Sequence, residues 1–155
     1  MPEVPIRDAQ EGDVNGIIDI LDELAKERGR DGVADADGVR KAFAACIGKT
    51  DHALVVALQE GRVAGYIAVH WIPFPVLNGT EGYISDLFVA AQSRGSGIGN
   101  MLLQVVEERA RTLHCRRLML HNRMMDESFT RGFYSKAGFT HAEFYATLVK
   151  ALDPI

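Results

Sequence analysis

The chain has 155 residues, of which 47% are hydrophobic and 25% are charged. This length and mixture predict one compact domain spanning residues 1–155, with a core from about residue 4 to 152. A formal net charge of −4 argues against nucleic-acid binding, which needs a basic face. No apolar run approaches the ~18 residues of a membrane span, so the sequence favours a cytoplasmic protein with no membrane partner.

The two cysteines, Cys46 and Cys115, lie far apart and belong to no CxxC pattern. No histidine stands beside either at zinc-ligand spacing, so we predict no disulfide framework and no metal site. Each is expected to be a reduced, buried, small hydrophobic residue.

The first third of the chain predicts one short strand and two helices. Residues 4–9 read as an extended segment, and Asp13 as the N-cap of a helix that runs to Glu27. Apolar residues recur in this segment at the 3.6-residue period of a helix. A polar, glycine-rich loop follows, and a second helix is expected over 37–47.

The middle of the chain has the pattern of strands. Residues 53–58 and 63–71 are expected to form a β-hairpin around the turn at 59–62. Residues 72–79 contain two prolines and are expected to form a loop, followed by a strand over 83–90.

In the last third a one-sided apolar stripe predicts a helix over 97–113. A strand at 117–120 is expected next, then a helix from Asp126 or Ser128 to Ala137 and a final strand over 139–149. The order β-α-α-β-β-β-α-β-α-β predicts an α/β fold, with a mixed central sheet flanked by helices.

Three alternating glycines, Gly95, Gly97 and Gly99, lie between a strand and an amphipathic helix. Such a loop lets the backbone approach a ligand, and the helix N-terminus adds unpaired N–H donors and partial positive charge. Arg94 could add a charge-assisted contact to a phosphate. The loop is neither a P-loop, which ends in Gly-Lys-Ser/Thr, nor a G-x-G-x-x-G fingerprint. A plain turn is the alternative, although each glycine costs roughly 0.5–1 kcal/mol of chain entropy.

Two blocks of sequence carry a resemblance to a known family. The strand YISDLFVA, the pattern Arg94-x-x-Gly97-x-Gly99 and the helix after it resemble the acyl-CoA motif of the GNAT family of N-acetyltransferases. The block from Phe133 to Phe139 is similar to that family's FY-x-K-x-GF. The resemblance covers nearly the whole chain and implies a single-domain GNAT-like fold that uses acetyl-CoA as co-substrate.

The resemblance implies that acetyl-CoA lies in a V-shaped opening between the strands at 83–90 and 117–121. The backbone near Val89 would polarise the thioester carbonyl. Many relatives carry Asn-x-x-Ala ahead of the FY block, where this chain has Glu127 and Thr130. Asn122, at the end of the preceding strand, would supply a contact to the pantetheine instead. The implied cofactor-binding residues are Leu87, Phe88, Val89, Arg94, Gly95, Ser96, Gly97, Ile98, Gly99, Asn100, Asn122 and Lys136.

Tyr134 matches the family's general acid, which protonates the CoA thiolate as it leaves. The acceptor amine also needs a base, and Glu81 is the first choice, with a water chain as the alternative. Strand alternation places Glu81 on one face with Tyr83 and Ser85, and Asp86 on the other. His70 and His121 are weaker candidates, because a lone histidine is more often structural.

The acceptor pocket is expected to draw on the apolar segment 71–77, through Trp71 and Phe74, together with Tyr83 and Ser85. Packing of this segment, including a homodimer contact, is the alternative.

The leading hypothesis is direct acetyl transfer in a ternary complex to a primary amine, preferably of a small molecule. A protein lysine or N-terminal amine is a variant of it. A non-catalytic acyl-CoA-binding or sensing module is the alternative from another class.

Overall fold

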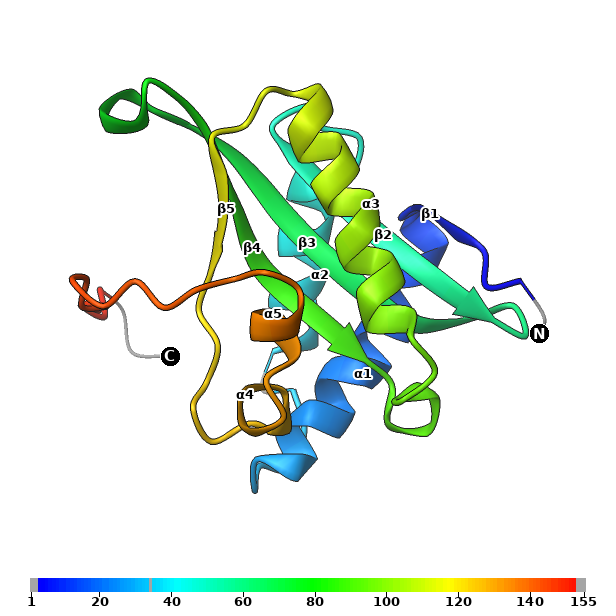
Figure 1. Ribbon diagram of the computed structural model, residues 1–155. Coiled ribbons are helices and arrows are strands. Elements are labelled where there is room, and N and C mark those ends of the chain that lie inside the picture. The colour runs from blue at the N-terminus through cyan, green and yellow to red at the C-terminus, as the bar shows by residue number, and fades with distance from the viewer. Residues whose placement is uncertain (1–2, 34, 153–155) are drawn as a thin grey trace. The chain divides into compact units, whose positions relative to one another are not determined.

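The computed structural model describes residues 3–33 and 35–152 (Figure 1). The chain consists of two compact units, Met1–His121 and Asn122–Ile155. The single domain expected over residues 1–155 therefore stays a prediction. No helix among the described residues is long and apolar enough to cross a membrane.

The first unit is built on a five-stranded mixed sheet with the spatial order β1-β2-β3-β4-β5. The first four strands pair antiparallel with their neighbours, while β5 runs parallel to β4. The α/β fold with a mixed sheet is thus confirmed. The strands are β1 (Ile6–Asp8), β2 (His52–Gln59), β3 (Arg62–Phe74), β4 (Gly79–Val89) and β5 (Arg117–Leu120).

Helices cover both faces of this sheet, as Figure 1 shows. α1 (Val14–Glu27) and α2 (Ala36–Cys46) lie on one face, and α3 (Ile98–Thr112) lies on the other. All three were expected to within about two residues at each end. The apolar stripes of the helices account for this arrangement, because each buries its stripe against the sheet. On the first face the core includes Ile17, Ile20, Phe43, Val56 and Tyr66.

Asp13 directly precedes α1, but its side chain does not cap the helix. The carboxylate accepts two hydrogen bonds from the Arg7 guanidinium, at 2.7 and 3.0 Å, and one from the Gln10 N–H at 2.7 Å. The hydrogen bonds from Arg7 hold the pKa of this buried carboxyl below its ordinary value. Asp13 therefore fastens β1 to the start of α1.

The hairpin between β3 and β4 is longer than expected. The segment 72–79 was expected to be a loop, but β3 continues to Phe74 and β4 begins at Gly79. Only a short 3-10 turn, Pro75–Leu77, separates the two strands. Cross-strand pairing of residues 72–74 with 79–81 keeps them extended, which overrides the turn tendency of the prolines.

Two irregularities shift the pairing within the sheet. One lies between Ala57 and Leu58 in the β2–β3 pair, and the other lies opposite Ala68 and Val69 in the β3–β4 pair. At the second, Ala68 pairs with Asp86 and Val69 with Ile84, so Ser85 is an extra residue in β4. This is a β-bulge, which re-aims side chains and increases the local twist.

β5 pairs with β4 only over residues 81–84. Residues 85–89 of β4 therefore extend past the last β5 pair, Ile84 with Leu120. The bulge at Ser85 falls where this pairing stops.

In the second unit the expected helix is interrupted. α4 (Glu127–Thr130) and α5 (Phe133–Lys136) are separate turns, and Gly132 between them has a left-handed φ of 66°. Gly138, with a φ of 91°, follows α5 as expected.

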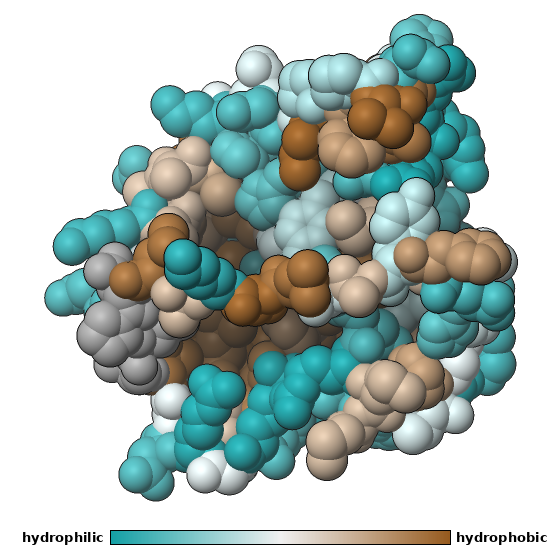
Figure 2. All heavy atoms as spheres, turned by 90° about the vertical axis from the view of Figure 1, so that its left-hand side faces the viewer, coloured by the Kyte–Doolittle hydropathy of each residue, from teal (hydrophilic) through white to brown (hydrophobic). Residues whose placement is uncertain are grey.

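The final strand expected over 139–149 is not formed in the described part of the chain. A strand exists through its pairing partner, and no strand of the described residues pairs with this segment. Phe144, Leu148 and Val149 of this segment are nearly fully exposed. Figure 2 shows exposed hydrophobic side chains among hydrophilic ones. The segment has the apolar pattern of a strand, but its own sequence does not determine which surface it packs against.

Candidate active site

The loop between β4 and α3 adopts a conformation that requires glycine. Gly95 and Gly97 have φ values of 78° and 87°, in the left-handed region, which costs other L-residues roughly 1–2 kcal/mol. A Cβ at either position would meet no atom within 4 Å, so the requirement is conformational and not steric. The first hydrogen bond of α3 runs from the Met101 N–H to Gly97 O, at 3.1 Å. The N–H groups of residues 98–100 come before it in the chain, and the first N–H groups of a helix have no acceptor within that helix. Such unpaired donors at a helix N-terminus suit an anionic ligand.

Side chains of this loop are used to hold its shape. The buried Ser93 hydroxyl donates to Gln59 Oε1 at 2.7 Å, and the Ser96 hydroxyl donates to Ser93 O at 2.5 Å. The Ile98 side chain is 1% exposed and lies beside Gly65. Ser96 and Ile98 can therefore offer a ligand their backbone N–H groups more readily than their side chains.

Arg94 fastens the loop to its neighbours. Its guanidinium donates to both carboxylate oxygens of Glu27 at 2.7 and 3.1 Å, and its Nε donates to Val89 O at 3.1 Å. This ion pair is half-exposed, and such pairs contribute little to stability. The phosphate contact expected of Arg94 thus needs an exchange of partner, from the Glu27 carboxylate to a phosphate.

The predicted cofactor-binding residues of β4 lie past the last β5 pair. The Phe88 ring packs against Tyr66 with centroids 6.0 Å apart, and Leu87 lies opposite Ile67 in the register with β3. Because the Phe88 side chain packs against the core, only the backbone of this residue could contact a ligand. The backbone role expected for Leu87, Phe88 and Val89 stays a prediction.

The bulge changes which side chains of β4 share a face. Ser85 Oγ lies 2.9 Å from His70 Nε2 and 3.5 Å from Asp86 Oδ2. Asp86 therefore does not point away from Ser85, as simple alternation had predicted, because the extra residue resets the period. Burial raises the pKa of the Asp86 carboxyl, partly offset by its hydrogen bond with Ser85.

Tyr83 and two histidines belong to the same group of side chains. The Tyr83 ring stacks on His70 with centroids 6.2 Å apart, and its hydroxyl lies 3.2 Å from His121 Nδ1. On the other side of His70, His52 Nδ1 lies 2.7 Å from His70 Nδ1.

His52 was not singled out from the sequence. Counting back from the turn that pairs Gln59 with Arg62 would place His52 opposite Val69. The irregularity in the β2–β3 pairing shifts it opposite His70 instead. No local sequence signal marks this shift.

Glu81, the first choice for the base, is 4% exposed and forms an ion pair with Arg117 of β5. It lies four residues before Ser85, about 13 Å along the strand. Glu81 therefore joins β4 to β5, and its carboxylate is already occupied.

The four residues expected to bind the acceptor do not form one group. Tyr83 and Ser85 lie together beside His70. Trp71 is buried and packs against Gly82, where an added Cβ would lie 2.7 Å from the indole ring. Phe74 lies at the far end of the hairpin opposite Gly79, beneath Arg117, about 20 Å along β4 from Ser85.

In the second unit, Tyr134 lies between the rings of Phe133 and Phe139, with centroids 4.9 and 5.7 Å away. Burial, and to a lesser extent Asp126, raise the pKa of Tyr134 to about 12. Asn122 Oδ1 accepts a hydrogen bond from Ser128 Oγ at 2.9 Å, and Lys136 is exposed at the end of α5.

Known proteins are similar to this chain in sequence and in fold. The model of the Acetyltransferase (GNAT) family matches residues 17–139. Thialysine N-epsilon-acetyltransferase of Bos taurus is 31% identical over 130 residues, which is 77% of this chain and 75% of the bovine protein. Aminoalkylphosphonate N-acetyltransferase of Salmonella typhimurium is 28% identical over 148 residues, 95% of this chain and 92% of the other.

Among solved structures, a protein of Bacillus halodurans C-125 described as a transcriptional regulator superposes with a TM-score of 0.82. The superposition covers 97% of this chain and all of the other, at 24% identity. At that identity the likeness shows the fold alone. The family match and the two relatives go further: the chain belongs to the GNAT family of acetyltransferases and is an acyltransferase.

Proposed function

We propose that this protein transfers an acetyl group from acetyl-CoA to a primary amine of a small molecule, by direct attack in a ternary complex. The observation that carries the proposal is the left-handed glycine loop at the start of α3, next to the end of β4. GNAT acetyltransferases use acetyl-CoA and an amine acceptor. The two relatives named above are named for thialysine and for an aminoalkylphosphonate, both small amines.

In the proposed complex the backbone of the glycine loop binds the pyrophosphate of acetyl-CoA, and residues 87–89 bind the pantetheine arm. The neutral amine attacks the thioester carbonyl carbon, so a C–N bond forms and negative charge develops on the carbonyl oxygen. A backbone N–H of β4 stabilises that charge. The C–S bond then breaks, the nitrogen loses its proton to a base, and the CoA sulfur gains a proton from Tyr134.

For the base we favour Asp86 over Glu81. A base must reach the amine directly or through one water, and Asp86 immediately precedes the predicted pantetheine residues. A carboxyl pKa raised by burial also makes a stronger base than an ordinary carboxylate. Glu81 is distant along the strand and bound to Arg117.

This assignment predicts that two isosteric variants, Asp86→Asn and Glu81→Gln, change the activity and the stability of the enzyme in opposite ways. Asp86→Asn should lower kcat/KM by roughly 10-fold to 100-fold, with water replacing part of the lost base. Wild-type activity should fall as the pH drops through the raised pKa of Asp86, because the base works deprotonated. Asp86→Asn should remove that acidic limb.

The same pKa shift has a stability consequence. A carboxyl whose pKa is raised by folding favours the folded state at low pH, and this contribution is lost as the pH rises through the folded pKa. Asp86→Asn should therefore raise Tm near neutral pH.

Glu81→Gln is the matched control. It should lower stability by about 1–3 kcal/mol, because it leaves a buried ion pair incomplete, and it should leave kcat/KM within a few-fold of wild type. Initial rates across a pH series give kcat/KM, and thermal melts give the stability of each variant. A Glu81→Gln enzyme that melts normally but loses its rate would transfer the role of base to Glu81.

The reaction itself is tested by following thiol release from acetyl-CoA with a panel of small amines, phosphonate-bearing amines and lysine peptides. We expect turnover with at least one small amine. Turnover with peptides alone would identify a protein acetyltransferase. CoA binding without turnover on any acceptor would favour the sensing module.

A further inference from the structure

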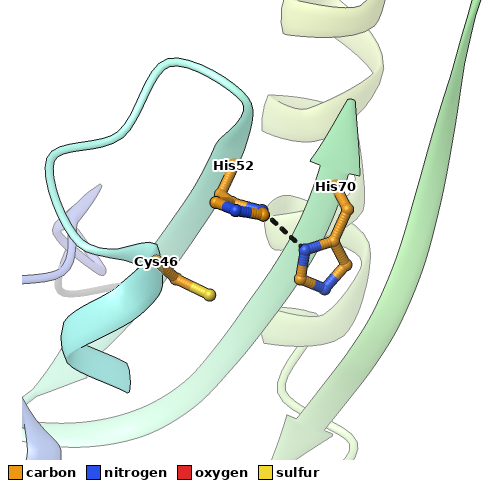
Figure 3. A group of neighbouring side chains, drawn as sticks. All are labelled: Cys46, His52 and His70. Carbon is orange, nitrogen blue, oxygen red and sulfur yellow. Dashed lines mark hydrogen bonds between the residues drawn. The ribbon is translucent and has the colours of Figure 1, made fainter. Parts of the chain in front are cut away.

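Three side chains to which the proposed acetyl transfer gives no role converge in the first unit, beside Ser85. Cys46 is the last residue of α2, His52 is the first residue of β2, and His70 lies on β3. One ligand atom from each lies within 4.8 Å of those from the other two. Figure 3 shows the Cys46 sulfur pointing toward the space where the two imidazoles meet.

The outer nitrogens of both histidines already have partners. His70 Nε2 lies 2.9 Å from Ser85 Oγ, and His52 Nε2 lies 3.6 Å from Asp51 Oδ1. A proton on each Nε2 would satisfy these partners, an assignment made from the surrounding groups. With an ion bound, each Nδ1 would then offer its lone pair to the metal. This is the arrangement of metal-binding histidines, in which the second ring nitrogen is fixed by a carboxylate or another polar group.

The two Nδ1 atoms face each other at 2.7 Å, with the rings nearly perpendicular at 81°. Without a metal ion this contact is a hydrogen bond, so one Nδ1 holds a proton that a bound ion would displace. Tetrahedral zinc, with bonds of about 2.0–2.3 Å, separates its ligand atoms by roughly 3.3–3.6 Å. Shifts of about an ångström in these side chains would accommodate the ion.

The electrostatic surroundings favour a cation. Asp51 Oδ1 lies 3.6 Å from His52 Nε2, and Asp86 lies beside Ser85, the hydrogen-bond partner of His70. The same two carboxylates would stabilise positive charge at the cluster.

We propose that Cys46, His52 and His70 bind one divalent transition-metal ion, Zn²⁺ above all, with a fourth coordination position left to water. One thiolate and two imidazoles are donors that zinc accepts and that calcium and magnesium do not prefer. The ion would join the end of α2 to the β2–β3 hairpin, and thus stabilise the fold. This proposal does not depend on the acetyl-transfer assignment.

The sequence had predicted no metal here, because the three residues match no ligand spacing. Five residues separate Cys46 from His52, and His70 lies on the opposite strand of the hairpin. Only the shifted β2–β3 register brings the two histidines together.

The test uses the full chain, freed of metal with a chelator and titrated with Zn²⁺ by calorimetry and with Co²⁺ by absorption. We expect one ion per chain, a Kd on the order of 1 μM or below, and a cobalt spectrum with a thiolate charge-transfer band. Added Zn²⁺ should also raise Tm, because the ion binds the folded state.

Cys46→Ser, His52→Ala and His70→Ala should each weaken Zn²⁺ binding by about 100-fold or more, and Cys46→Ser should abolish the charge-transfer band. Cys115→Ser is the matched control, since Cys115 is the second free cysteine and is equally half-buried. It should bind metal as wild type does. Circular dichroism of each metal-free variant checks that it is folded.

Absence of stoichiometric binding by the wild-type chain would overturn the proposal. So would a folded Cys46, His52 or His70 variant that binds Zn²⁺ as tightly as wild type.

Discussion

Replacing Tyr134 by phenylalanine is expected to lower kcat by about 100-fold or more. The reason is that the departing CoA thiolate would lose its proton donor. Because burial raises the pKa of Tyr134 to about 12, the phenol keeps its proton at every pH near neutrality. It would therefore act as a hydrogen-bond donor whose proton moves to sulfur as the C–S bond breaks. Steady-state rates with saturating acetyl-CoA and acceptor measure the effect.

The affinity for CoA should change little in Tyr134→Phe, because the ring and its contacts with Phe133 and Phe139 remain. Tyr145→Phe is the control, since Tyr145 is largely exposed and has no role in the proposed chemistry. An unchanged kcat in Tyr134→Phe would remove this residue from the role of acid. A kcat lost equally in both variants would point to a general effect of removing a hydroxyl.

Substituting Gly97 by alanine is expected to abolish CoA binding at ordinary concentrations, a loss of at least about 100-fold. A Cβ at a φ of 87° costs roughly 1–2 kcal/mol, and the loop relieves that strain by rotating its peptide groups. The N–H donors at the start of α3 would then no longer point together at the pyrophosphate. The stabilisation of the protein by CoA in thermal melts measures the loss, since the stabilisation by a bound ligand grows with the logarithm of its concentration divided by Kd.

Gly61→Ala is the matched control for this experiment. Gly61 has a similar φ of 75°, and an added Cβ there would likewise meet nothing within 4 Å. It lies in the turn between β2 and β3, outside the glycine loop. Both variants should lose a comparable amount of stability, but Gly61→Ala should still be stabilised by CoA. Retained CoA stabilisation in Gly97→Ala would contradict the assignment of the loop.

Local patterns predicted most of the fold. Each of these patterns is contained in one short stretch of sequence. This holds for the apolar stripes of α1, α2 and α3 and for the apolar runs of β2 to β5. Their secondary structure follows from which face can be buried. The glycine loop is local in the same sense, because left-handed φ values at Gly95 and Gly97 are a property of the backbone itself.

Pairing between distant segments could not be predicted in this way. The extra residue at Ser85 brings Asp86 to the same face as Ser85 and His70. The ion pair of Glu81 with Arg117 depends on the register of a parallel pair whose strands are separated by a whole helix. The segment over 139–149 has a strand-like pattern but no partner strand among the described residues. Each of these outcomes is set by a register or a partner surface that single-sequence periodicity does not encode.

The sequence by itself determined the mixed α/β fold, the glycine loop and the block around Tyr134, since these depend on residues that are neighbours along the chain. The tertiary structure decided that Glu81 is paired with Arg117 and that Asp86 lies beside Ser85. It also decided that Cys46, His52 and His70 meet. The physical reason is the same in both cases: a shift of one residue in strand pairing changes which side chains face each other, and that shift is fixed by long-range packing.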